Sequence, residues 1–139
     1  MITLYLIRHG ETTYNLDGRI QGLLDAPLTD YGLAQAEALA ERLAGEKFDA
    51  CWSSDLGRAR VTADIILKHH NLAVNETPLL READYGVLQG LTQKDIEKEF
   101  PLEEHEWRRD KSLQAPGMET RQSVLARCSE FLGIIAEKV

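Results

Sequence analysis

The sequence has 139 residues, 43% of them hydrophobic and 28% charged, which is the size and balance of one soluble globular domain. Its 23 acidic and 16 basic side chains give a formal net charge of -7, which disfavours nonspecific binding to nucleic acid or to anionic membranes. No apolar stretch is long enough to span a bilayer, and the first residues do not have the pattern of a signal peptide. We therefore expect a single cytoplasmic domain, 1–139, with no nucleic-acid or membrane partner.

The first predicted element is a strand at 2–7, where a nearly unbroken apolar run ends abruptly in polar residues. Such a run is typical of a strand that is buried on both faces in the centre of a parallel sheet. A polar loop is expected over 10–27. A helix then begins after Thr29, a plausible N-cap, and is expected to stop near Gly45.

A second short strand is predicted at 48–52, and a helix is expected to follow it. Caps for that helix are offered by the polar run 53–55, and apolar side chains recur at helical spacing after it. The stretch 73–80 is a weaker candidate for a third strand. This order of strands and helices predicts an α/β domain with a largely parallel sheet.

Two more helices are predicted in the second half of the chain. Thr92, with Asp95 three residues later, resembles a capping box that opens a helix through Phe100. A longer helix is expected to begin near Thr120. Its apolar stripe consists of Val124, Cys128, Phe131 and Ile135.

Arg8 and His9 stand where the first predicted strand ends, the place where open α/β sheets bind their ligands. A neutral imidazole is a good nucleophile toward phosphorus, and a guanidinium is a preferred partner for a phosphoryl group. The alternative is a strand end that happens to carry two polar residues. The pair alone would favour that alternative.

Two further motifs follow the other predicted strands. Arg58 falls in the first turn of a predicted helix, where a cation opposes the helix dipole but could hold an anion. Glu82 is a candidate general acid, although Asp84 competes with it on sequence grounds. Taken singly, Arg58 could be a surface arginine and Glu82 an ordinary loop carboxylate.

Taken together, these motifs make the chain similar to the histidine phosphatase superfamily, in its phosphoglycerate mutase-like branch. The resemblance covers essentially the whole chain and implies a three-layer α/β/α fold with a mostly parallel sheet. It is carried by LIRHGET at 6–12, RIQG at 19–22, PLTDYGLAQA at 27–36, SSDLGRARVTA at 53–63, LREADYG at 80–86, LQGLT at 88–92 and PGMET at 116–120.

The resemblance also assigns roles to residues. His9 would accept the phosphoryl group, Arg8 and Arg58 would clamp its oxygens, and Glu82 would donate the proton to the leaving group. The remaining predicted phosphate-binding residues are Asn15, Gln21 and Gly22. No metal or other cofactor is implied, because arginines supply the positive charge, and the remaining histidines and the two cysteines have no recognisable zinc-site spacing.

One part of the family pattern is not in the sequence. The family has a strand after the long helix, and that strand ends in a second catalytic histidine. We therefore interpret 1–139 as a domain truncated at its C-terminus, without that strand or histidine. Either 1–139 is a fragment of a longer polypeptide, or another chain covers the open sheet edge, for example in a homodimer. In both cases residues 1–139 alone should have little or no activity.

The resulting prediction is a phosphatase that hydrolyses small soluble phosphomonoesters through a phosphohistidine on His9. Its partner would be a small phosphorylated metabolite, whose identity the sequence leaves open. Two alternatives remain: a cofactor-dependent phosphoglycerate mutase and a noncatalytic module that binds phospho-ligands. The short stretch from Gly90 to Pro116 favours the phosphatase, because mutases of the family usually carry a longer insertion there.

Overall fold

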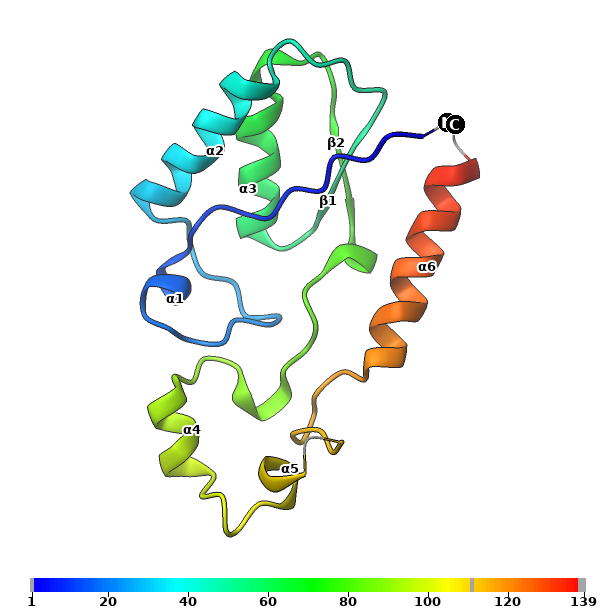
Figure 1. Ribbon diagram of the computed structural model, residues 1–139. Coiled ribbons are helices and arrows are strands. Elements are labelled where there is room, and N and C mark those ends of the chain that lie inside the picture. The colour runs from blue at the N-terminus through cyan, green and yellow to red at the C-terminus, as the bar shows by residue number, and fades with distance from the viewer. Residues whose placement is uncertain (1, 111, 138–139) are drawn as a thin grey trace.

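The computed structural model describes residues 2–110 and 112–137, and it has an α/β architecture in three layers (Figure 1). Two parallel strands, β1 (Cys51–Ser54) and β2 (Val74–Thr77), form the sheet within this part of the chain. Helix α3 (Gly57–Ile66) packs against β1 and against α2 (Asp30–Leu43). Helix α6 (Arg121–Glu137) lies on the other side of the sheet (Figure 1).

The remaining elements are short and lie in the connections. Helix α1 (Thr13–Leu16) interrupts the loop that follows the first segment, whereas α4 (Gln93–Glu99) and α5 (Glu106–Arg109) lie together below the sheet (Figure 1). Single 3-10 turns are η1 (Leu67–His69), η2 (Pro78–Leu80) and η3 (Gly86–Leu88).

Helix starts that depend on local capping agree with the sequence predictions. The Thr29 side chain accepts a hydrogen bond from the Gly32 amide at the start of α2. At α4, Thr92 and Asp95 form the expected reciprocal capping box. The stripe predicted for α6 is half-buried to buried, and Ile135 is its most buried member. These elements are confirmed because each signal lies within one turn of the feature it specifies.

Two boundaries differ from the predictions. The second predicted strand, 48–52, is found at Cys51–Ser54. Helix α3 receives no side-chain cap from the run 53–55, because its N-cap residue is Leu56. The group that caps α3 comes from a distant loop, as described below.

The prediction of a buried strand at 2–7 is wrong for this structure. No backbone ladder pairs with this segment in the described chain, and its apolar side chains are exposed; Leu6 is 91% exposed. Within this segment the Tyr5 hydroxyl donates a hydrogen bond to Glu46 Oε2 at 3.1 Å, and the Tyr5 ring packs edge-on against Phe48. An apolar run becomes a buried strand only when neighbours cover it, and β1 and β2 pair with each other instead.

The buried core is small and lies mainly between α2 and α3. Its α2 members are Ala36, Ala40 and Leu43, which face Ile66 and Leu67. The chain exposes 9182 Å² of surface, about a quarter more than the about 7,300 Å² that a compact domain of 15.6 kDa would expose. The exposed segment 2–7 accounts for part of that excess.

A close approach of two backbones fixes the segment that carries His9. A Cβ placed on Gly32 in α2 would lie 2.0 Å from the Glu11 carbonyl oxygen, and one placed on Gly10 would lie 2.4 Å from the Gly32 oxygen. Only glycine allows this crossing at both positions. The chain therefore passes directly over the first turn of α2 just after His9.

Because the two backbones cross here, replacing a glycine of α2 by alanine should change stability in the direction opposite to the usual one. Glycine to alanine inside a helix normally stabilises by up to about 1 kcal/mol. Gly32→Ala should instead destabilise the protein by about 1–3 kcal/mol, because the new methyl group overlaps the Glu11 carbonyl. Urea unfolding measures the difference.

Gly133→Ala in α6 is the matched control, since a Cβ there meets no atom within 4 Å. It should leave stability unchanged or raise it. A Gly32→Ala protein as stable as its parent would mean that the two backbones do not cross so closely.

Candidate active site

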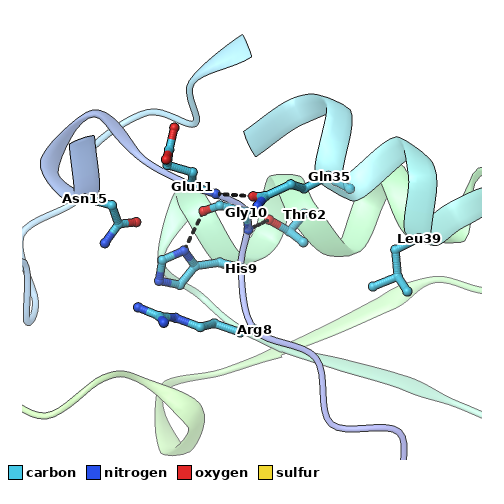
Figure 2. A pocket seen from close by; sticks show the side chains of 9 residues that line it. Arg8, His9, Gly10, Glu11, Asn15, Gln35, Leu39 and Thr62 are labelled. Carbon is cyan, nitrogen blue, oxygen red and sulfur yellow. Dashed lines mark hydrogen bonds between the residues drawn. The ribbon is translucent and has the colours of Figure 1, made fainter. Parts of the chain in front are cut away.

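Arg8 and His9 lie on the floor of an open cavity of about 440 Å³ beside α2 and α3 (Figure 2). Arg8 is exposed, whereas His9 is half-buried. Within the described chain Arg8 makes no hydrogen bond or ion pair, so its guanidinium is available to a ligand. The residues that line the cavity are Arg8, His9, Gly10, Glu11, Asn15, Gln35, Ala36, Leu39 and Thr62.

The imidazole of His9 is held by its own backbone neighbour. Its Nδ1 lies 2.8 Å from the carbonyl oxygen of Gly10 (Figure 2). A carbonyl oxygen can only accept, so Nδ1 carries the proton and donates it. In the neutral ring the lone pair then lies on Nε2, the nitrogen that is free to attack an electrophile.

The surroundings of His9 keep it neutral. Burial is the largest effect, and it lowers the pKa of His9 below 6.5. The hydrogen bond to Gly10 acts in the opposite direction, and the cations of Arg58 and Arg8 lower the pKa further. Glu82 raises the pKa of His9, and its effect is the smallest of those named.

A threonine that the sequence analysis missed ties the His9 segment to α3. The Gly10 amide donates to Thr62 Oγ1 at 3.1 Å, and that hydroxyl donates to the Arg58 carbonyl at 2.7 Å. Thr62 is buried and stands one helical turn after Arg58. The four-residue spacing between Arg58 and Thr62 is visible in the sequence, but the hydrogen bond between Thr62 and Gly10 is not.

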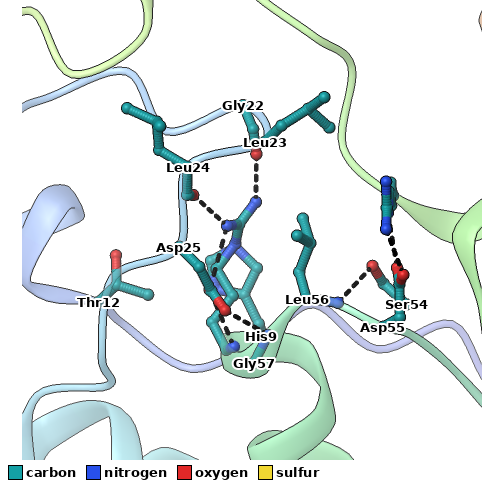
Figure 3. Close-up of polar contacts among 12 residues, drawn as sticks. His9, Thr12, Gly22, Leu23, Leu24, Asp25, Ser54, Asp55, Leu56 and Gly57 are labelled. Atoms are coloured by element: carbon teal, nitrogen blue, oxygen red, sulfur yellow. Dashed lines mark hydrogen bonds and ion pairs between the residues drawn. The ribbon is translucent and has the colours of Figure 1, made fainter.

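Arg58 is almost completely buried and binds two carbonyls of a distant loop (Figure 3). One terminal nitrogen, Nη1, donates to Leu24 O and the other, Nη2, to Gly22 O, both at 2.8 Å. Arg58 acts electrostatically on His9, and its guanidinium also holds residues 22–24. Its contact with phosphate stays a prediction. Gly22, predicted to contact phosphate, contributes its carbonyl to Arg58.

Asp25 compensates for the unfavourable position of Arg58, a cation at the N-terminus of helix α3. Its carboxylate accepts hydrogen bonds from the amides of Gly57 and Arg58, at 2.5 and 3.2 Å, and lies 3.5 Å from Arg58 Nη1 (Figure 3). An anion at a helix N-terminus is stabilising, and here it also forms an ion pair with the buried cation. Sequence reasoning overlooked Asp25 because it lies 32 residues before the helix it caps.

The two polar atoms of the Asn15 side chain differ in their contacts. Its Oδ1 accepts from the backbone amide and the hydroxyl of Thr12, both at 3.0 Å, which forms the capping box of α1. No acceptor in the described chain takes a hydrogen from its Nδ2. The amide group lies beside His9 in the cavity, so this nitrogen is available to an anion (Figure 2).

Two of the other residues considered from the sequence, Glu82 and Asp84, line a second cavity of about 330 Å³. Glu82 is exposed, lines that cavity and accepts from the Ala83 amide at 2.8 Å. Asp84 accepts from the Gly86 amide, a turn contact. Gln21 is buried, and its Oε1 has no hydrogen-bond partner in the described chain.

Residues 2–110 and 112–137 contain no group of histidine, cysteine and carboxylate side chains that could hold a metal ion. In the same residues no helix is long and apolar enough to cross a membrane. The positive charge near His9 comes from Arg8 and Arg58.

Comparison with known proteins gives one family and several solved structures. The family described as the histidine phosphatase superfamily (branch 1) matches residues 4–139. A probable phosphoglycerate mutase, GpmB of Yersinia pestis, is 42% identical over 109 residues, which are 78% of this chain and 49% of that protein. The chain thus spans about half the length of the curated relatives it matches.

Two solved phosphatases share the fold. A putative alpha-ribazole-5'-P phosphatase from Escherichia coli is 33% identical with a TM-score of 0.84, over 94% of this chain and 65% of that one. A mycobacterial glucosyl-3-phosphoglycerate phosphatase, solved with VO3, is 36% identical with a TM-score of 0.81. The match covers 94% of this chain and 62% of that one. Both matches support the α/β architecture described above.

The contrast between the two arginines can be tested through stability. Arg58→Met leaves the buried Gly22 O without its donor, and an unsatisfied buried acceptor costs about 1–3 kcal/mol. Arg8→Met removes an exposed group without a partner in the described chain, so the change should be within about 0.5 kcal/mol. Both variants should bind vanadate more weakly. Equal stability losses on urea unfolding would contradict this division of roles.

The burial of His9 and the charges around it predict its pKa and how that pKa changes on substitution. Its pKa should lie below 6.5, and Arg8→Met should raise it because a nearby cation has been removed. Titration of the His9 ring protons by NMR measures both values. Arg19→Met is the control, since Arg19 is not among the groups that shift His9. A midpoint at or above 6.5 in the parent protein would overturn the description of the site.

Proposed function

The chain belongs to the histidine phosphatase superfamily (branch 1), and from this premise we propose that the protein hydrolyses small phosphomonoesters through a phosphohistidine on His9. The observation that carries the proposal is the state of the His9 ring. Its Nδ1 is bound to the Gly10 carbonyl, its pKa is lowered by burial, and cations flank it. A neutral imidazole with a fixed, free Nε2 is an activated nucleophile.

In the first step, Nε2 of His9 attacks phosphorus and the bond from phosphorus to the ester oxygen breaks. The leaving alcohol takes a proton from Glu82, so the step forms a phosphohistidine and a neutral alcohol. Arg8 and Arg58 lie close enough to His9 to compensate charge on the phosphoryl oxygens, and Asn15 Nδ2 adds a donor. Charge compensation and positioning dominate this kind of transfer.

In the second step, a water molecule attacks the phosphohistidine. Glu82, now ionised, takes a proton from that water, the bond from phosphorus to Nε2 breaks, and inorganic phosphate leaves. The cycle restores the neutral ring of His9 and the protonated carboxyl of Glu82. One carboxylate therefore serves as acid and then as base.

Glu82 suits this role better than Asp84. The carboxylate of Glu82 acts electrostatically on His9, whereas Asp84 is not among the groups that shift the His9 ring. Asp84 instead accepts the Gly86 amide and stabilises a turn. We assign proton transfer to Glu82 on these grounds.

The proposed substrate is a small soluble phosphoester. The solved phosphatases that resemble this chain are named for glucosyl-3-phosphoglycerate and for alpha-ribazole-5'-phosphate, both small phosphorylated metabolites. We propose a substrate of that class here. We also propose a cytoplasmic location, because both Cys51 and Cys128 are free thiols.

A phosphoglycerate mutase is the second candidate, favoured by the 42% identity to a probable enzyme of that name. The two activities share the phosphohistidine and differ in its acceptor, which is water in a phosphatase and a hydroxyl of phosphoglycerate in a mutase. Isomerisation of phosphoglycerate without net release of phosphate would support the mutase.

The nucleophile can be tested by trapping the intermediate. Brief incubation of the natural protein with a phosphoester should leave an acid-labile, base-stable phosphate on His9. His9→Ala should abolish both the trapped phosphate and turnover, while the circular dichroism spectrum stays that of the parent. Full activity of His9→Ala would overturn the proposal.

The proton donor can be tested with leaving groups of different basicity. Glu82→Gln should slow hydrolysis of an alkyl phosphate by about 10²- to 10⁴-fold and hydrolysis of an activated aryl phosphate far less. The reason is that an activated leaving group needs little protonation. Asp84→Asn is the matched comparison, and if it alone shows this selectivity the two roles must be exchanged.

A further inference from the structure

Arg127 of α6 holds the segment that leads into Glu82. Its Nη1 donates to the carbonyls of Leu79 and Arg81, at 2.8 and 2.6 Å. These carbonyls lie three residues and one residue before the proposed acid. The backbone entering Glu82 is thus fixed by a side chain from a helix 46 residues further along the chain.

The same arginine is locked by Glu119. Its Nε donates to one carboxylate oxygen at 2.9 Å and its Nη2 to the other at 3.0 Å, which is a bidentate pair. Only 17% of the Arg127 side chain and 18% of the Glu119 side chain are exposed. A pair so shielded from water has one preferred geometry, unlike a surface ion pair.

Glu119 also holds the far side of the acid-bearing segment. Its amide donates to the Asp84 carbonyl at 2.8 Å. The carbonyls of Leu79 and Arg81 are therefore bound by the Arg127 side chain and that of Asp84 by the Glu119 backbone, and Glu82 lies between these attachments. Arg81 adds two hydrogen bonds to Asp55, with 41% of the Arg81 side chain and 25% of the Asp55 side chain exposed.

Glu82 itself depends on this support. Within the described chain its carboxylate accepts a hydrogen bond from its own neighbour, the Ala83 amide. Glu82, Glu119 and Arg127 all line the second cavity. The pKa of Arg127 is raised chiefly by its hydrogen bonds to Glu119, and Glu82 adds a smaller effect of the same sign.

We propose that Arg127, locked by Glu119, is a positioning residue that sets the reach of Glu82 for proton transfer. The inference rests on the proposed function, because it assumes that Glu82 serves the ester oxygen. Arg127 does not touch the reacting atoms. It acts by fixing the backbone on which Glu82 stands, and small displacements of a catalytic group are costly in rate.

The kinetic test uses the natural protein and two esters, an alkyl phosphate and an activated aryl phosphate. Arg127→Met should lower kcat for the alkyl ester about tenfold more than for the aryl ester, with little change in KM. In a Glu82→Gln background the same substitution should add no further selectivity. Arg127→Lys should not restore the parent rate, because one ammonium cannot reproduce the fork that binds two carbonyls and a carboxylate.

Arg121→Met is the matched control, since Arg121 is an exposed arginine at the start of the same helix. It should leave both rates unchanged. A second measurement is hydrogen exchange at the Ala83 amide, which Arg127→Met should accelerate because the segment loses its anchor.

Unchanged exchange at Ala83 would overturn the proposal whatever the kinetics show. Equal losses for both esters, persisting in the Glu82→Gln background, would also overturn it and indicate a purely structural role. Failure to trap phosphate on His9 in the parent protein is a different result, because it would remove the proposed function itself.

Discussion

A single buried cation organises the site. The Arg58 guanidinium is almost fully removed from water, so each of its donors needs an acceptor within the protein. The carbonyls of Gly22 and Leu24 and the carboxylate of Asp25 meet that need, and in doing so they bring a loop from the first quarter of the chain onto the start of α3. His9 lies beside this assembly. The charge that could hold a phosphoryl group is therefore the same charge that holds the loop in place.

The nucleophile and the proposed acid are supported by separate parts of the fold. His9 is fixed through Gly10, which crosses Gly32 of α2 and binds Thr62 of α3. Glu82 is fixed through the pair formed by Glu119 and Arg127, on the opposite side of the sheet. Within the described chain the two groups line different cavities.

The sequence predicted what depends on neighbouring residues. Thr29 and Thr92 cap the helices expected of them, and Arg8 with His9 forms a motif within two positions. Asp25, Thr62 and Arg127 escaped prediction because their partners lie tens of residues away and no local pattern marks them. The strand expected at 2–7 fails for a related reason. Apolar composition indicates only that a segment can be buried. Whether other elements cover the segment depends on the whole fold.

The long reach of these contacts sets an order of events during folding. The bond from Gly10 to Thr62 spans 52 residues, and the bond from Arg127 to Leu79 spans 48. Contacts of such separation require large loops to close first, which makes them late and slow to form. Helices α2 and α4, with their local caps, can begin to form independently of those closures. The reactive constellation is consequently among the last features to assemble as the chain folds, and a partly folded molecule carries helices but no organised site.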